Sequence, residues 1–108
     1  MATSKKSTTS FQDLIDDPIP VIIDFYADWC GPCKAFAPML EQLKNDLGDT
    51  ARIVKIDVDR NQELSTALGV QSIPTVMIFQ NGELKFRGAG VQPVARLKQE
   101  IAQLTGGS

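Results

Sequence analysis

The residues that most directly indicate chemistry are two cysteines, Cys30 and Cys33, with two residues between them. Thiols at this spacing can form an exchangeable disulfide, form half of a zinc site, or occur together by chance. A disulfide across so short a ring contributes only about 2 kcal/mol through chain entropy, against about 4.7 kcal/mol for a 100-residue loop. Stability is therefore a weak reason for the pair. Zinc is disfavoured because its sites take four ligands and the chain has no histidine, so redox chemistry is the favoured interpretation.

The segments on either side of the cysteines predict a buried strand followed by a long helix. Residues 21–27 are apolar on both faces apart from Asp24, which is typical of a central parallel strand covered by helices on both sides. Apolar residues then recur at helical spacing over residues 31–47, and Pro38 should kink this helix. The cysteines therefore follow the carboxyl end of a central strand, where α/β sheets place their sites.

This position predicts different roles for the two thiols. Cys30 immediately precedes the helix, so the helix macrodipole and unpaired backbone N–H groups would stabilise its thiolate at neutral pH. Cys33 lies one turn into the helix and should be more shielded. Gly31 and Pro32 keep the turn short, because proline fixes a helix-compatible φ where no intrahelical donor is needed. Cys30 is therefore the candidate nucleophile and Cys33 the candidate resolving thiol.

The remaining patterning completes a single α/β domain. It predicts a short helix from about Ser10, a strand over 52–58, a short helix ended by Gly69, strands over 75–79 and 84–87, and a helix over 93–104. Strand, helix and strand in succession imply that the first two strands are parallel, joined by a right-handed crossover. Asn81-Gly82 predicts a tight turn, so the last two strands should be antiparallel. The fold class is an α/β sandwich of three layers, with a mixed sheet of about four strands between helices.

Composition fits one globular domain and excludes several classes of function. The chain has 108 residues, of which 43% are hydrophobic and 22% charged, and these fractions are close to globular averages. We expect a polar, flexible N-terminal tail over 1–9, the domain over 10–105 and a C-terminal tail over 106–108. A net charge of -2 without a dense basic cluster argues against a nucleic-acid surface.

The expected location of the chain is the cytoplasm. Its apolar runs are too short for a membrane span, and its polar N-terminus lacks the apolar segment of a signal peptide. A reducing cytosol keeps most thiols free, which again favours redox use of the cysteines over a structural disulfide.

Three other residues each have a functional and a structural interpretation. Asp24 would be desolvated in its apolar strand and its pKa raised, which makes it a functional candidate. Alternatively, it is satisfied by backbone donors or paired with Lys55. Pro74 is either a proline tolerated at the start of a strand or a special feature of the site. Trp29 is either a core aromatic residue or a contact surface beside the nucleophile.

The sequence around the cysteines resembles the active site of the thioredoxin family, and the resemblance extends from about residue 11 to residue 104. It rests on the run Trp29-Cys30-Gly31-Pro32-Cys33-Lys34. Disulfide isomerases and strong oxidases of this superfamily typically carry a histidine between the cysteines, which favours a reductant here. The resemblance implies a thioredoxin-like fold and a protein-disulfide reductase that acts through a mixed disulfide.

The resemblance also implies roles for the supporting residues. Asp24 would accept the proton of Cys33, with Lys55 as its partner. Pro74 would be cis and face the cysteines, and Ile73 would offer backbone groups to an extended substrate segment. The substrate-binding groove implied by the family comprises Trp29, Gly31, Pro32, Ile73, Pro74, Gly90 and Val91.

The implied partners are a thioredoxin reductase, dependent on NADPH or ferredoxin, and client proteins that contain disulfides. No bound cofactor, metal, nucleic acid or membrane is expected, and the chain should be a monomer. Two alternatives remain open, namely a redox-independent protein-binding scaffold and a dimer bridged by metal at two CxxC half-sites. Two departures from the family are noted. Residues 1–9 lack the alternation of a first edge strand, and Tyr26 stands where many members carry tryptophan.

Overall fold

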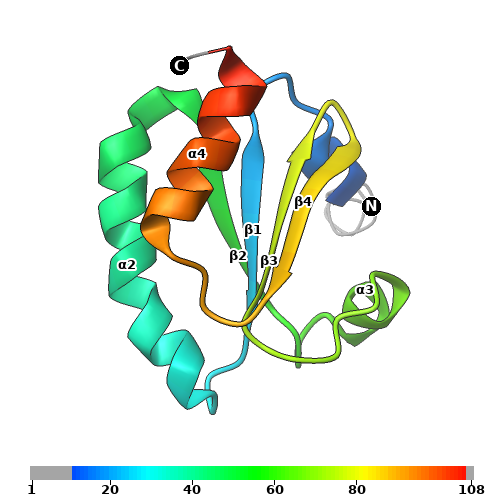
Figure 1. Ribbon diagram of the computed structural model, residues 1–108. Coiled ribbons are helices and arrows are strands. Elements are labelled where there is room, and N and C mark those ends of the chain that lie inside the picture. Colours follow the sequence, from blue (N-terminus) through cyan, green and yellow to red (C-terminus); the bar gives the residue numbers. More distant parts are fainter. Residues whose placement is uncertain (1–10, 107–108) are drawn as a thin grey trace.

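A computed structural model describes residues 11–106, and it has a four-stranded sheet with helices on both faces (Figure 1). Residues 11–15 are helical. The elements that follow are β1 (Val21–Tyr26), α2 (Gly31–Leu47), the 3-10 turn η1 (Gly48–Thr50), β2 (Arg52–Asp57), α3 (Gln62–Ala67), β3 (Thr75–Gln80), β4 (Glu83–Ala89) and α4 (Val94–Thr105). The expected tail over 1–9, the predicted lack of a first edge strand, and residues 107–108 lie outside the described residues.

The sheet has the strand order β2-β1-β3-β4 and is mixed, as predicted. Strands β1 and β2 are parallel, whereas β3 is antiparallel to both β1 and β4. The hairpin between β3 and β4 turns on Asn81 (φ 53) and Gly82 (φ 80). Two positive φ values are those of a two-residue turn whose twist matches the flanking strands. The parallel register places Asp24 opposite Lys55.

The core is divided by the sheet, which explains why β1 and β3 are apolar on both faces. On one face, Ile22 and Ile78 pack with the buried residues of α2 and α4. On the other face, Ile23 and Met77 pack with Ile15 and with partly buried residues that flank α3. In Figure 1, α2 and α4 lie on one side of the sheet, and the 11–15 helix and α3 lie on the other. Since side chains alternate along a strand, Asp24 shares the face of Ile22, which α2 covers.

Helix α2 is the element that carries the cysteines. It spans the predicted residues and buries Phe36, Leu40 and Leu43 along one side. Pro38 lies inside the helix, where its ring nitrogen cannot donate to the carbonyl four residues earlier. The helix ends at Gly48, whose φ of 55 few other residues adopt readily. Burial of the Phe36 side chain alone contributes roughly 1.5–3 kcal/mol from area removed from water.

The strand predicted over 84–87 is longer in the structure and spans Glu83–Ala89. Its side chains are mostly exposed, and it contains Gly88, so its hydrophobic pattern is weak. Backbone pairing with β3 makes the strand longer than predicted, because this pairing continues as far as Thr75 and Ala89. Among residues 11–106, no helix is long and apolar enough to cross a bilayer.

Candidate active site

The two cysteines lie where β1 passes into α2, as predicted, and their sulfurs are bonded to each other. Cys30 is the residue that caps α2, and Cys33 lies in the first turn, with 5.3 Å between their Cα atoms. The backbone N–H of Cys33 donates to Sγ of Cys30 over 3.1 Å. The Cys30 sulfur therefore holds the position of a capping acceptor, where backbone dipoles stabilise negative charge.

Burial does not distinguish the two cysteines, contrary to the expectation that Cys33 is more shielded. Both residues are 4% exposed. Their surroundings do differ: Sγ of Cys30 lies 3.8 Å from the carbonyl oxygen of Ile73, whereas Cys33 lines a small cavity on the Lys55 side. The contact of Cys30 with the loop that carries Ile73 joins residues 43 apart in the chain, and helix position alone cannot reveal it.

The loop before β3 meets the cysteines and is linked to the residues after β4. The Ile73–Pro74 peptide bond is cis, so the geometry implied by the resemblance is present. The carbonyl of Pro74 accepts a hydrogen bond of 2.7 Å from the N–H of Gly90. Two of the three segments predicted to flank Cys30 are therefore joined to each other by backbone. Gly90 is half-buried and Val91 is 41% exposed.

Trp29 is an exposed residue beside the cysteines, and its interpretation as a core aromatic is wrong. It is 69% exposed, and its indole N–H donates to Oδ2 of Asp59 over 2.8 Å. This hydrogen bond fixes the ring beside Cys30 while leaving its apolar surface in solvent. Asp59 was not identified from the sequence, because nothing in its local pattern indicates a partner 30 residues earlier.

Asp24 is buried without a hydrogen-bond partner among the described residues, so its interpretation as an acid satisfied by backbone donors is not supported. The residue is 1% exposed, and neither carboxylate oxygen has a hydrogen-bond partner among the described residues. Desolvation by burial raises the pKa of Asp24 to about 6, while the charge of Lys55 opposes this shift. An acid in this state changes its protonation close to neutral pH.

The Lys55 ammonium group is held against an aromatic ring. Its Nζ lies 4.5 Å from the ring centroid of Tyr26, within the range of a cation–π contact. Tyr26 was noted in the sequence only as a departure from a common tryptophan. The structure shows that the Lys55 side chain packs against the Tyr26 ring.

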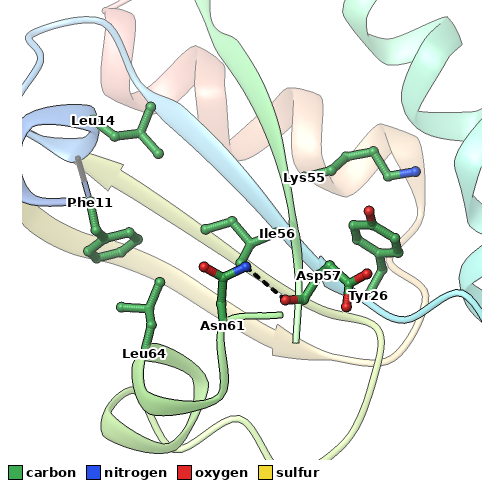
Figure 2. Close-up of a pocket in the computed structure, with 8 residues that line it drawn as sticks. All are labelled: Phe11, Leu14, Tyr26, Lys55, Ile56, Asp57, Asn61 and Leu64. Carbon is green, nitrogen blue, oxygen red and sulfur yellow. Dashed lines mark hydrogen bonds between the residues drawn. The ribbon is translucent and has the colours of Figure 1, made fainter. Parts of the chain in front are cut away.

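Two cavities meet these residues. The first, of about 120 Å³, contains Cys33, Lys34 and Ala37 from α2, and its other lining residues are Tyr26, Ala27, Asp28 and Lys55. The second, of about 420 Å³, includes neither cysteine and is lined by Phe11, Leu14, Tyr26, Lys55, Ile56, Asp57, Asn61 and Leu64. Figure 2 shows Lys55 and Tyr26 at one end of it and Phe11 and Leu14 at the other. The space beside Cys33 is therefore small and partly polar.

Residues 11–106 contain no group of three or more histidine, cysteine, aspartate or glutamate side chains that could hold a metal ion. The arrangement of the cysteines, with a buried acid on the α2 face of the sheet and an exposed tryptophan beside them, is suited to closing and opening a disulfide.

Comparison with known proteins points to the same chemistry. A family model described as Thioredoxin matches residues 2–103. A thioredoxin from Bacillus subtilis is 43% identical over 101 residues, which is 94% of this chain and 96% of the relative.

Solved structures agree in fold. A mutant thioredoxin from Halobacterium salinarum has a TM-score of 0.80 and 41% identity, covering 90% of this chain and 84% of that chain. A second structure has a TM-score of 0.79 and 34% identity. It comes from work on the thiol-resolving mechanism in yeast mitochondrial 1-Cys peroxiredoxin via glutathione/thioredoxin systems. That match covers 88% of each chain.

Thioredoxins need no bound cofactor and are reduced by a thioredoxin reductase, and they are disulfide oxidoreductases. With the Cys30–Cys33 pair in place and similarity over nearly its whole length, this chain is a thiol-disulfide oxidoreductase that belongs to the thioredoxin family.

Proposed function

We propose that this protein reduces disulfides in other proteins by two successive exchanges. The Cys30 thiolate attacks one sulfur of a client disulfide, which forms a mixed disulfide and releases the other client sulfur as a thiolate. The Cys33 thiolate then attacks the Cys30 sulfur, which closes the internal disulfide and releases the second client sulfur. The client gains two electrons and the cysteine pair loses two. The single observation that carries this proposal is the Cys30 sulfur at the helix cap, 3.1 Å from the N–H of Cys33.

Asp24 is the proposed acceptor of the Cys33 proton in the second exchange. Its carboxylate is buried on the sheet face that α2 covers and has no hydrogen-bond partner of its own among the described residues. With a pKa of about 6, roughly nine in ten such groups are ionised at pH 7, yet the carboxylate is more basic than an exposed one. Lys55 keeps enough positive charge nearby to prevent a still higher pKa.

The proposed substrate groove flanks Cys30. Its members are Trp29, Gly31, Pro32, Ile73, Pro74, Gly90 and Val91. An extended client segment would pair with the backbone of Ile73, as in strand addition, while exposed apolar surface such as that of Trp29 contacts its side chains. Because backbone pairing reads little of the client sequence, this groove supports broad specificity.

The finer biological setting is also part of the proposal. A thioredoxin reductase that draws on NADPH or ferredoxin would restore the dithiol, and the clients would be proteins with accessible disulfides. The protein would act as a cytoplasmic monomer whose domain covers residues 10–105. The similarity to a structure from work on the resolution of a yeast mitochondrial 1-Cys peroxiredoxin supports thiol peroxidases as a client class to test first.

The deciding experiment is reduction of insulin disulfides with dithiothreitol as electron donor. We expect the wild type to accelerate reduction, Cys30→Ser to be inactive, and Cys33→Ser to accumulate a mixed disulfide that mass spectrometry detects. Asp24→Asn should leave the first exchange nearly unchanged and slow the second. A wild-type protein that does not accelerate reduction would overturn the proposed function, and equal slowing of both exchanges in Asp24→Asn would overturn the role of that residue.

A further inference from the structure

The segment between α3 and β3 is bonded at its start to α3 by the backbone N–H groups of Gly69 and Val70, and to a distant strand by one side chain. Arg87, on β4, donates through Nη1 to the carbonyl of Leu68 over 2.6 Å. Its Nη2 donates to the carbonyl of Gly69 over 2.7 Å. A single guanidinium group therefore bridges β4 to the first residues that follow α3.

The same strand also holds the end of this segment. The N–H of Gly90, directly after β4, donates to the carbonyl of Pro74 over 2.7 Å. The last part of β4 pairs with the start of β3, where Ala89 lies opposite Thr75. Residues 68–74 are therefore tied to β4 at both ends, and in Figure 1 they pass beside the end of β4 that leads into α4.

The backbone carbonyl of Ile73, the part of the segment nearest to the Cys30 sulfur, lies between these two ties. The carbonyl oxygen of Ile73 lies 3.8 Å from Sγ of Cys30. Ile73 lies between the two tied points, so we expect its position to depend on where the start of the segment is held. Of the two ties, the one at Pro74 is backbone to backbone, whereas the one at Arg87 is a side chain and can be removed by substitution.

The geometry of the Arg87 contact suits arginine better than lysine. A helix leaves its last carbonyl groups without intrahelical partners, and Leu68 caps the C-terminus of α3. The planar guanidinium offers two N–H groups in a fixed fork, which suits two neighbouring carbonyls, whereas lysine offers a single compact charge. The side chain also lies close against Gly69, where a Cβ would be 3.6 Å from Nη2 of Arg87.

We propose that Arg87 is a positioning residue for the recognition of protein substrates: it fixes residues 68–74 so that the Ile73 backbone meets an extended client segment beside Cys30. The inference rests on the proposed function, because it assumes that clients pair with Ile73. The hydrogen bonds of the Arg87 side chain go to the carbonyls of Leu68 and Gly69 and not to either cysteine. Its loss should therefore weaken the binding of an extended protein segment and leave the thiol chemistry itself unchanged.

The test compares a protein substrate with a small disulfide that cannot pair with backbone. The variants are Arg87→Gln, Arg87→Lys and the matched control Lys85→Gln, which removes the same charge from the same strand. Insulin reduction with dithiothreitol gives KM and kcat. Reduction of cystine by pre-reduced protein is followed in a single turnover through the fluorescence of Trp29, the chain's one tryptophan.

For Arg87→Gln we expect the KM for insulin to rise about threefold to tenfold, with kcat and the cystine rate within about twofold of wild type. Arg87→Lys should recover part of the loss, and Lys85→Gln should match wild type. An unchanged KM for insulin, or a cystine rate that falls in parallel, would overturn the proposal. A wild type inactive on both substrates would instead overturn the proposed function.

Urea unfolding of each variant distinguishes a purely structural role of Arg87 from the proposed positioning role. Such a role would lower the free energy of unfolding without moving KM in the folded protein. If Arg87→Gln does not fold, Arg87→Lys decides the question, because it retains the charge and the stem but not the fork. A normal insulin KM in folded Arg87→Lys, together with normal stability, would overturn the need for the bidentate contact.

Discussion

Replacing Asp24 by asparagine should stabilise the oxidised protein at neutral pH and change its stability little near pH 4. The carboxylate is buried without a hydrogen-bond partner among the described residues, so folding must desolvate a charge whenever Asp24 is ionised. Asparagine has nearly the same shape but carries no charge at any pH. The penalty that the wild type bears above the pKa of Asp24 is therefore absent in the variant.

The magnitude follows from the pKa of Asp24, which burial raises from 3.8 to about 6. Each unit of difference between folded and unfolded states corresponds to 1.36 kcal/mol, so the penalty at pH 7 is about 3 kcal/mol. The sign follows from proton binding. Between the two pKa values the folded state holds more protons than the unfolded state, so the stability of the wild type falls as pH rises through this range. Near pH 4 the folded state is almost fully protonated and the unfolded state is only partly ionised, so the penalty has fallen below about 1 kcal/mol.

The assay is urea unfolding of the oxidised protein at several pH values between about 4 and 8, followed by far-ultraviolet circular dichroism. Asp16→Asn is the control, because it removes an equal charge from an exposed position. The reasoning is refuted if Asp24→Asn is no more stable than wild type at pH 7, or if its gain is the same at pH 4 as at pH 7. Either result would mean that desolvation of the carboxylate does not set the stability difference.

Three further predictions test other parts of the structure. Lys55→Met should move the titration midpoint of Asp24 upward in a carboxyl ¹³C NMR titration, because the charge of Lys55 lowers that pKa; an unchanged midpoint would contradict the coupling. Phe36→Ala should lower the free energy of unfolding by about 3–5 kcal/mol in urea, since the ring is fully buried, and a loss below about 1 kcal/mol would argue against this core. Gly82→Ala should cost about 1 kcal/mol because Gly82 has a φ of 80, whereas Gly31→Ala, where φ is not positive and nothing lies within 4 Å of an added Cβ, should cost less.

Much of the fold was predictable because it is encoded locally. Residues 21–26 read as a strand covered on both faces because every position but Asp24 is apolar, and the structure buries both faces. Helix α2 has the predicted bounds because its buried residues recur at helical spacing and Gly48 ends it. The Asn81-Gly82 turn fixed the antiparallel hairpin for the same reason, since its backbone preference is a property of those two residues.

The residues proposed to carry the chemistry, Cys30, Cys33 and Asp24, could also be identified from the sequence, each for a physical reason. The spacing of Cys30 and Cys33 at the start of a helix indicates redox chemistry without knowledge of the fold. An aspartate in an apolar strand indicates a raised pKa, and that direction is what the structure gives. The sequence did not indicate that Asp24 lacks a hydrogen-bond partner among residues 11–106, because that depends on which donors the packed sheet and helix bring near it.

Only the tertiary structure determined the contacts between residues that are far apart in the chain. Trp29 meets Asp59, 30 residues later, and Arg87 meets the carbonyls of Leu68 and Gly69, 19 and 18 residues earlier. The loop that holds Ile73 contacts Cys30 from 43 residues away, and both cysteines are equally buried. Hydrophobic period and turn preference act over a few residues, so they determine the elements of this protein. The mutual placement of loops depends on how the finished layers pack, and no local pattern records it.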